Sequence, residues 1–270
     1  MKKAEGRRQK VLLWISAFCI LPSAFVSCAP QATFLERKVS LQGKTYAYRV
    51  WLPRHYTRLH RWPVIVFLHG SGESGDDNLR QLTAGLPLVL RHDPARYPAI
   101  VVIPQCPFDQ EWYGAMESVA LAELEKSIKE FRGDRRRIYL TGMSMGGAGV
   151  WYLARHAGRF AAIAPVCGEV TRAADDPFPF PPPPDLATVL AAPDPFAALA
   201  ARIGKTPVWA FHGAGDPVIS VEQSRRMTSA LRARGGNVRY TEYAGQGHNV
   251  WDLAYNDPAL PRWLFGQRRH

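Results

Sequence analysis

The sequence predicts an α/β fold: a mostly parallel central sheet with helices on both faces. Short, continuous apolar runs are typical of strands buried on both faces. Segments with helical spacing separate these runs, and alternating strands and helices imply right-handed crossovers between parallel strands. The composition, 47% hydrophobic and 21% charged over 270 residues, fits a single globular domain with a large core. The apolar runs are Val64–Leu68, Ala99–Ile103, Ile138–Leu140, Ala161–Ala164 and Val208–Phe211.

The remaining elements can be placed in chain order. A period of two runs through Phe34–Gln42 and again through Thr45–Leu52, which predicts an N-terminal antiparallel hairpin. Val238–Tyr243 supplies a last strand, and Val250–Leu264 is expected to form a closing helical region. The helices between the strands are expected at Asn78–Arg91, Glu117–Phe131, Met145–His156, Phe196–Ile203 and Val221–Arg234.

A proline-rich segment interrupts this alternation. Residues 175–194 contain DDPFPFPPPPD, and consecutive prolines are incompatible with a helix or a central strand. We therefore expect an external loop before the strand at Val208–Phe211. Residues 169–195 are interpreted as an insertion, either an active-site flap or an inert surface excursion.

The N-terminus has the pattern of an export signal. Basic residues crowd the first ten positions, and the almost uncharged run VLLWISAFCILPSAFVS follows at residues 11–27. A membrane-spanning anchor is the alternative, but the run is shorter than the roughly 20 residues that a bilayer core requires, and Pro22 interrupts it. We expect residues 1–27 to be a signal peptide and residues 28–270 to form one domain.

The end of this run, Phe25-Val26-Ser27-Cys28, resembles the lipobox of bacterial lipoproteins. The resemblance implies lipidation of Cys28 and membrane association in the bacterial cell envelope, on the periplasmic or outer-membrane side. Cleavage by ordinary signal peptidase near Ala29 is the alternative, and it would yield a secreted protein. Arg7-Arg8 also resembles a twin-arginine signal.

Two cysteines remain beyond the lipobox, and the chain is basic. Cys106 and Cys167 either pair in an oxidising compartment or are two buried thiols, and the sequence leaves both open. The formal net charge of +11 favours attraction to anionic lipid or cell-wall polymer. Nucleic acid is not expected as a partner, because the arginines are scattered and their one tight cluster, Arg135–Arg137, precedes a strand. The oligomeric state is left open.

Ser144 is the candidate nucleophile. It lies in Gly142-Met143-Ser144-Met145-Gly146, between an apolar strand and a helix. A strand–turn–helix context holds a serine in a strained geometry, and the two glycines remove side chains that would clash with the neighbouring elements. The helix expected from Met145 offers backbone N–H groups and its positive dipole end to a developing oxyanion.

A serine nucleophile requires a base, and the base requires a carboxylate to orient it. Asp216 follows the strand Val208–Phe211, and His248 follows Val238–Tyr243. The chain order is thus Ser, Asp, His, and both partners lie past strand ends, where the active sites of open α/β sheets form. The alternative is a turn aspartate and a capping histidine.

The glycine-rich stretch that starts at His69 follows the first buried strand. Its glycines allow a backbone N–H near Ser71 to turn inward beside that of Met145, which predicts the second donor of an oxyanion hole. A phosphate-binding loop is excluded because no lysine followed by Ser or Thr comes at the required spacing. We expect His69 to brace this turn. Candidates for lining the substrate pocket, which could instead be core aromatics, are Trp112, Tyr113 and Trp151.

The chain resembles the α/β-hydrolase superfamily, and within it the exported esterases and predicted peptidases related to polyhydroxybutyrate depolymerases, feruloyl esterases and the phospholipase/carboxylesterase group. The resemblance implies Ser144 as nucleophile, Asp216 and His248 as its partners, Ser71 and Met145 as oxyanion donors, and no metal or cofactor. The matching motifs are LHGSGESGDDN from Leu68, VVIPQCPFDQEW from Val101, GMSMGG from Gly142, FHGAGDPVI from Phe211 and GHNVWDLAY from Gly247.

These observations predict a serine hydrolase, and in particular a carboxylic ester hydrolase that acts through an acyl-enzyme on a small-molecule or polymer ester. A serine peptidase of the prolyl-oligopeptidase-like type is one alternative, although about 240 mature residues leave little room for a gating domain. A non-catalytic binding protein of the cell envelope is the other.

Overall fold

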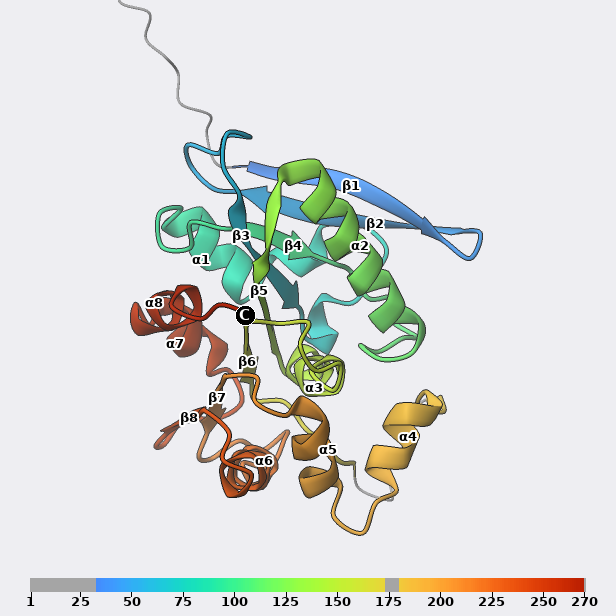
Figure 1. The fold of residues 1–270 in the computed structure, drawn as a ribbon, viewed down its shortest axis with the longest axis vertical. Helices are drawn as coiled ribbons and strands as arrows, with labels where there is room; N and C mark the ends of the chain where they lie inside the picture. The colour runs from blue at the N-terminus through green and yellow to red at the C-terminus, as the bar shows by residue number, and fades with distance from the viewer. Residues whose placement is uncertain (1–32, 173–179, 270) are drawn as a thin grey trace, which may run out of the picture.

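A single eight-stranded sheet organises the molecule, with helices on both of its faces (Figure 1). The computed structural model describes residues 33–172 and 180–269. The predictions for residues 1–27 and for Cys28 lie outside these residues. The strand order is β1-β2-β4-β3-β5-β6-β7-β8. The strands are β1 (Thr33–Leu41), β2 (Lys44–Leu52), β3 (Trp62–Leu68), β4 (Ile100–Ile103), β5 (Gly133–Met143), β6 (Ala162–Val166), β7 (Val208–Gly213) and β8 (Val238–Tyr243).

The pairing confirms the predicted α/β fold and its N-terminal hairpin. β1 pairs antiparallel with β2 from Thr33↔Leu52 to Leu41↔Lys44, and β2 pairs antiparallel with β4. All pairs from β4 to β8 are parallel. The carboxyl ends of β3, β5, β7 and β8 therefore meet at one edge of the sheet.

The helices follow the predicted segments, with one clear exception. Residues 78–91 were expected to form one helix, but the chain forms a 3₁₀ turn, η2 (Arg80–Leu82), and a helix that begins only at Leu86. Asp77 explains the difference, because its carboxylate accepts the backbone N–H groups of Leu79 and Arg80 and holds a turn. The helices are α1 (Leu86–His92), α2 (Ala115–Phe131), α3 (Met145–Leu153), α4 (Pro184–Leu190), α5 (Pro195–Ile203), α6 (Glu222–Ala233), α7 (Trp251–Asn256) and α8 (Ala259–Phe265).

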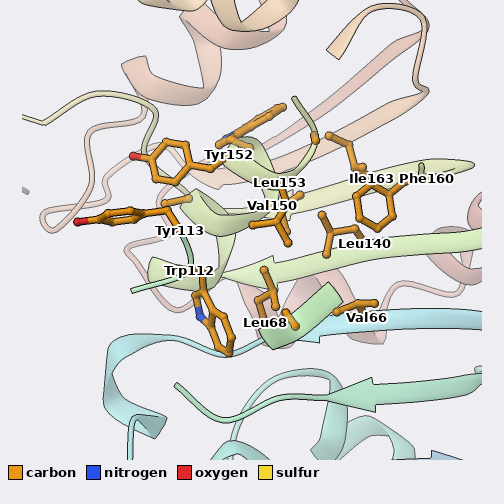
Figure 2. Packing of buried hydrophobic residues seen from close by; sticks show 14 of the residues in the cluster. Val66, Leu68, Trp112, Tyr113, Leu140, Val150, Tyr152, Leu153, Phe160 and Ile163 are labelled. Carbon is orange, nitrogen blue, oxygen red and sulfur yellow. The ribbon is translucent and has the colours of Figure 1, made fainter. Parts of the chain in front are cut away.

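The sheet is buried on both faces, as the continuous apolar runs predict. In β3, Val64, Val66 and Leu68 pack into one hydrophobic cluster, whereas Ile65 and Phe67 pack into the other. The first cluster joins the sheet to α2, α3, α5 and α6, and the second joins it to α1, α7 and α8. Figure 2 shows the first cluster where β3, β5 and β6 meet α3.

The proline-rich insertion contains a helix, so the prediction of a loop throughout was wrong. α4 begins at Pro184, and a proline in the first helical position loses no intrahelical hydrogen bond and already has a helical φ. The side chains of Leu186 and Val189, both in α4, are buried. Arg155, at the end of α3, holds this helix with an ion pair to Asp185 at 2.7 Å. Residues 173–179 lie outside the described residues.

Cys106 and Cys167 are both buried and unpaired, which resolves the alternatives in favour of two thiols. Within residues 33–172 and 180–269, no helix is long and apolar enough to cross a bilayer.

Glu123 on α2 is a buried carboxyl group that lowers stability at neutral pH. It is 1% exposed, and neither side-chain oxygen has a hydrogen-bond partner within the described part of the chain. Burial raises the pKa of Glu123 well above its ordinary value. Below about pH 4.5 the folded and unfolded states both hold the proton. As the pH rises further, the unfolded state releases it first, so the native state loses about 1.4 kcal/mol per pH unit until the folded pKa is reached.

We therefore expect Glu123→Gln to be more stable than the wild type at pH 8, with an advantage that shrinks as the pH falls toward 4.5. Urea unfolding at several pH values measures this slope. Glu130→Gln, on the same helix but partly exposed and paired with Arg37, is the control and should show no such gain. A difference between Glu123→Gln and wild type that does not change with pH would contradict the assignment.

Candidate active site

Ser144, His248 and Asp216 meet at the carboxyl edge of the sheet. Ser144 follows β5, Asp216 lies in the loop after β7, and His248 lies in the loop after β8. The Ser144 Oγ is 2.8 Å from His248 Nε2, and His248 Nδ1 is 2.7 Å from Asp216 Oδ2. The structure thus brings together three residues that are separated by up to 104 positions in the chain.

Ser144 has a strained backbone between β5 and α3. Its φ of 54° and ψ of −121° lie in a region that residues with a side chain rarely adopt. The conformation is held on both sides, because the Ser144 N–H donates to Val166 O at 3.0 Å and the Ser144 carbonyl accepts from Ala148 at 3.0 Å. In this conformation the Ser144 hydroxyl meets His248.

The glycines that flank Ser144 permit the close packing of this turn. A Cβ on Gly142 would lie 2.5 Å from the Gly146 carbonyl oxygen. A Cβ on Gly146 would lie 2.0 Å from the carbonyl oxygen of Leu68 at the end of β3. Both distances are far inside van der Waals contact, so the first turn of α3 can touch β3 only where glycine is present.

The buried Asp216 carboxylate is fully hydrogen bonded. Its Oδ1 accepts the backbone N–H groups of Val218 and Ile219, both at 2.9 Å, which leaves Oδ2 for His248. Because a carboxylate can only accept, the His248 proton is on Nδ1 and Nε2 is free to accept from the Ser144 hydroxyl. This tautomer is the one that a general base requires.

The sequence analysis missed a second histidine at Asp216. His212, fully buried in β7, places Nε2 2.9 Å from Ile219 O and 3.2 Å from Asp216 Oδ2. Its Nδ1 accepts from the Ser224 hydroxyl at 2.7 Å, so Nε2 carries the proton that faces the carboxylate. Burial lowers the pKa of His212, which keeps the ring neutral. The motif FHGAGD contained the signal, since His212 is the penultimate residue of the strand that leads to Asp216.

Ser71 and Met145 lie side by side around a small cavity. Ser71 is the first residue of the 3₁₀ turn η1 (Ser71–Glu73), and Met145 is the first residue of α3. Backbone N–H groups at such positions have no partner inside their own helix. The cavity has a volume of about 240 Å³ and is lined by Ser71, Ser74, Phe108, Asp109, Gln110, Glu111 and Met145.

His69 braces the loop that carries Ser71, as the sequence predicts. The fully buried ring accepts the Cys106 N–H on Nε2 at 2.9 Å and donates from Nδ1 to the Gly70 carbonyl at 2.7 Å. Burial lowers the pKa of His69 to about 4, so this pair of contacts persists at neutral pH. A Cβ on Gly70 would lie 3.4 Å from the Ser144 Cβ, which places this loop directly against the serine.

The aromatic residues proposed to line the pocket are instead core residues. Trp112, Tyr113 and Trp151 are each at most 1% exposed, so their side chains are enclosed by the protein. Figure 2 shows Trp112 and Tyr113 beside the apolar side chains of this cluster. The Trp112 indole donates to the His69 carbonyl at 2.9 Å and so supports the Ser71 loop from beneath. Tyr113 donates its hydroxyl to the Phe180 carbonyl at the start of the described insertion. All three aromatic side chains belong to the hydrophobic core around α3.

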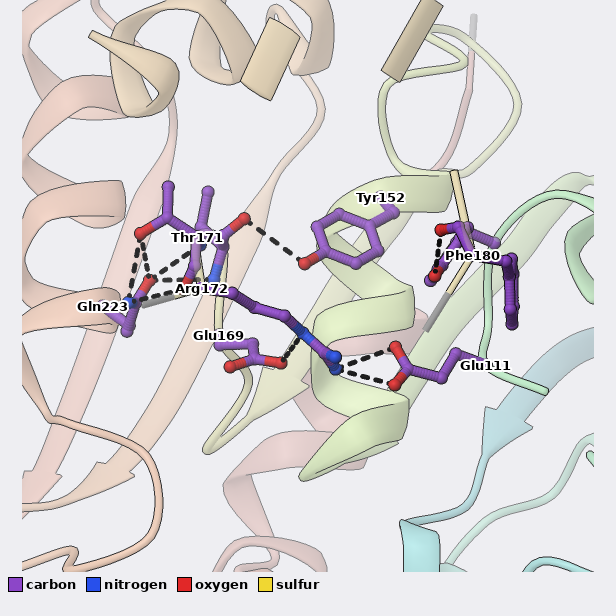
Figure 3. A network of polar contacts seen from close by, with 9 residues as sticks. Glu111, Tyr152, Glu169, Thr171, Arg172, Phe180 and Gln223 are labelled. Carbon is purple, nitrogen blue, oxygen red and sulfur yellow. Dashed lines mark hydrogen bonds and ion pairs between the residues drawn. The ribbon is translucent and has the colours of Figure 1, made fainter. Parts of the chain in front are cut away.

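A polar network closes one side of the cavity. Figure 3 shows Arg172 between Glu111, whose carboxylate oxygens both lie 2.8 Å from Nη2, and Glu169, which is 3.0 Å from Nε. Gln223 of α6 accepts the backbone N–H groups of Val170 and Thr171. The segment after β6 is therefore tied both to the cavity wall and to α6.

Cys167 lies close enough to Asp216 and His248 for the three side chains to form a potential metal-binding group within the described structure. Its sulfur, an oxygen of Asp216 and a nitrogen of His248 lie within 4.8 Å of one another. Burial raises the pKa of the Cys167 thiol, and a protonated thiol is a poor metal ligand. Asp216 and His248 already bond each other, so the grouping is accounted for without an ion. The sequence prediction that no metal or cofactor takes part stays a prediction.

Comparisons with known proteins identify a family and similar folds. Residues 111–252 match the family model described as the dienelactone hydrolase family, and no curated protein sequence matches the chain. A thermostable esterase of known structure is 29% identical, with a TM-score of 0.73 over 87% of this chain and 63% of that one. A ferulic acid esterase is 19% identical, with a TM-score of 0.64 over 87% of this chain and 97% of that one.

An acylaminoacyl peptidase from Pyrococcus horikoshii is 14% identical, with a TM-score of 0.67 over 89% of this chain and 42% of that one. At this identity, as for the ferulic acid esterase, the likeness concerns the fold. The chain spans less than two thirds of the length of the thermostable esterase.

The contact at Gly146 leads to a stability prediction. We expect Gly146→Ala to lose about 3 kcal/mol or more, because the new methyl group would overlap the Leu68 carbonyl and the main chain would have to move. Thermal unfolding of the purified variants measures the loss. Gly72→Ala is the matched control on the same edge, since a Cβ there meets no atom within 4 Å. An unchanged midpoint for Gly146→Ala would contradict the packing described.

Proposed function

The chain belongs to the dienelactone hydrolase family, within the α/β-hydrolase superfamily, and we propose that it is a serine esterase that cleaves carboxylic esters through an acyl-enzyme. The observation that carries the proposal is the series Ser144 Oγ, His248 Nε2, His248 Nδ1 and Asp216 Oδ2, joined at 2.8 and 2.7 Å with the tautomer that a base requires. The hydrolase class follows from the family, and the roles below are our assignment.

In the proposed reaction, Ser144 Oγ attacks the ester carbonyl while His248 Nε2 takes its proton. The carbonyl π electrons move onto oxygen, and the resulting tetrahedral anion collapses to an acyl-serine. His248 returns the proton to the leaving alcohol. Water then repeats the sequence in the second half-reaction: His248 takes a proton from water, and the resulting hydroxide attacks the acyl carbon. The second tetrahedral anion collapses with cleavage of the bond between the acyl carbon and Ser144 Oγ, His248 returns the proton to Ser144, and the carboxylic acid leaves. Asp216 keeps the imidazole oriented and stabilises its charged form.

We assign stabilisation of the tetrahedral anion to the backbone N–H groups of Ser71 and Met145. Both groups belong to the first residues of helical turns, both residues line the same cavity, and Met145 directly follows Ser144 in the chain. Donors that are held before the substrate arrives cost no reorganisation when charge develops on the oxygen. The His69 bonds to Cys106 and Gly70 supply this rigidity on the Ser71 side.

An ester is favoured over a peptide as the substrate for two reasons. The most similar of the solved structures named above, at 29% identity, is described as a thermostable esterase. The cavity of about 240 Å³ beside Ser71 and Met145 suits one small substituent rather than several peptide side chains. The likeness to acylaminoacyl peptidase concerns the fold, so peptide hydrolysis is treated as an outcome of the experiment.

We also propose that the protein works in the bacterial cell envelope. Residues 1–27 would act as the signal peptide and Cys28 as the lipidated residue, with secretion as the result if ordinary signal peptidase cleaves near Ala29. Globomycin, which blocks lipoprotein signal peptidase, should cause the precursor to accumulate in the producing cell. Normal processing in its presence would exclude the lipoprotein assignment.

Ser144→Ala tests the nucleophile directly. We expect kcat for a p-nitrophenyl ester to fall by about 10⁴-fold or more and labelling by a fluorophosphonate to disappear, because no other hydroxyl faces His248 within the described structure. Ser118→Ala is the control and should keep full activity, because Ser118 is an exposed residue of α2 whose hydroxyl bonds the Gly114 carbonyl. Retained labelling of Ser144→Ala, or a higher kcat/KM for peptides than for a panel of esters, would reject the proposal in its present form.

His212 is proposed as a positioning residue, and its removal should change the pH profile. His212→Phe loses the N–H that faces Asp216 Oδ2, so this oxygen bonds His248 alone and stabilises its protonated ring more strongly. We expect a roughly tenfold lower kcat, an unchanged KM, and an acid limb of kcat/KM that moves to higher pH.

His212→Gln, which keeps a donor, should restore part of kcat. Ser224→Ala removes only the hydroxyl behind the ring and should have the smaller effect. A purely structural role for His212 would lower stability and leave the position of the acid limb unchanged.

A further inference from the structure

The edge of the sheet opposite Ser144 is strongly basic. The strands from β4 to β8 are parallel, so the loops that precede β3, β5 and β6, together with the chain end after α8, gather at the edge where the strands start. We name this surface the basic edge. It is made of Arg58, Arg61, Arg132, Arg135, Arg136, Arg137, Arg159, Arg268 and Arg269.

Hydrogen bonds show that the basic edge is one continuous surface. Trp62 N donates to Arg132 O, and Arg137 Nη2 donates to Arg61 O at 2.9 Å. The Arg269 N–H bonds Arg136 O at 2.9 Å, and its Nη1 bonds Arg159 O at 2.9 Å. Loops far apart in the chain therefore hold their arginines side by side.

Most of this positive charge is not neutralised. Arg58, Arg136 and Arg269 donate to main-chain carbonyls, which orient a guanidinium group without cancelling its charge. The described ion pairs of the basic edge go to two carboxylates, and each is shared by two arginines: Glu125 by Arg135 and Arg159, and Asp134 by Arg137 and Arg268.

The basic edge also contains a concave site of the size of a headgroup. A cavity of about 450 Å³ opens between β5, the loop before β6 and the chain end. Three arginines line it, and their donors can be shared with a phosphate group. The lining residues are Glu125, Arg135, Ile138, His156, Ala157, Gly158, Arg159 and Arg269.

The active-site edge has the opposite charge. Between β3 and α1, and between β4 and α2, the loops carry Glu73, Asp76, Asp77, Asp109 and Glu111 against the single Arg80. The molecule is therefore polarised along its strands, with carboxylates around Ser144 and arginines at the far edge. An anionic surface would attract the basic edge and repel the site, which fixes an orientation.

The path of the chain indicates which anionic surface the basic edge faces. Thr33 pairs with Leu52, which leads into the loop of Arg58 and Arg61, so the chain enters the fold at the basic edge (Figure 1). Cys28, the proposed lipid attachment point, lies only a few residues before Thr33. Leu59 stands in the same loop with 88% of its surface exposed, as expected of a side chain that enters the interfacial region of a bilayer.

We propose that the basic edge binds the anionic headgroups of a lipid bilayer and holds the active-site edge away from the membrane. A flat, electrostatic contact of this kind strengthens with each basic residue near an anionic surface and weakens with salt. The proposal does not depend on the esterase assignment, because neither Ser144 nor its partners belong to this edge.

The test is co-sedimentation of the full chain with vesicles of phosphatidylcholine alone and with 30% phosphatidylglycerol added. Hydrophobic attachment through the N-terminus contributes equally to both, so the ratio of the two partition coefficients isolates the basic edge. For the wild type we expect this ratio to be about tenfold or more at 50 mM NaCl and to approach one at 500 mM. In the variant Arg58→Gln/Arg61→Gln/Arg136→Gln this ratio should be lower by about tenfold or more at 50 mM NaCl.

The matched control removes the same number of charges elsewhere. Lys38→Gln/Lys44→Gln/Arg226→Gln changes three exposed cations on β1, β2 and α6 and should keep the wild-type preference. Thermal unfolding establishes that both variants are folded. Equal losses in the two variants would reduce the effect to net charge and overturn the proposal. So would an unchanged preference in the arginine variant, or tighter binding of duplex DNA than of vesicles at equal phosphate concentration.

Discussion

The active-site edge depends on one main-chain contact, between Gly146 at the start of α3 and the carbonyl of Leu68 at the end of β3. With no side chain at Gly146, the helix approaches until a Cβ would lie 2.0 Å from that oxygen. The residue after Leu68 is His69, whose loop leads to Ser71, and Ser144 lies two residues before Gly146. A single close approach therefore sets the position of the proposed nucleophile relative to both proposed oxyanion donors.

Burial assigns different tasks to the three histidines at this edge. His69 and His212 are fully buried, and desolvation lowers the pKa of each, so they remain neutral and orient a loop and a carboxylate. The His248 side chain is 13% exposed and bonds both Asp216 and Ser144. It is the histidine that contacts the Ser144 hydroxyl, which fits the role of general base.

The direction of the strands also organises the charge of the molecule. Because the central strands are parallel, their carboxyl ends collect the acidic loops around the site, and their amino ends collect the arginines of the basic edge. The topology that assembles the chemistry on one side therefore leaves a cationic surface on the other. Arginines that are scattered in the sequence therefore gather on one side of the folded molecule, and the site on the other side is acidic.

The amino-acid sequence predicts the alternation of strands and helices, because buried strands and amphipathic helices have characteristic patterns of apolar residues. It also determined the order Ser144, Asp216, His248, since each follows a strand end. Local sequence rules failed where a neighbour intervened: Asp77 capped a turn inside a predicted helix, Pro184 began a helix within a predicted loop, and Trp112 packed beneath His69. Three features arise from tertiary packing: the contact of His212 with Asp216, the hydrogen bond between His69 and Cys106, and the gathering of distant arginines at one edge. These depend on distances between residues far apart in the chain, and no local period encodes them.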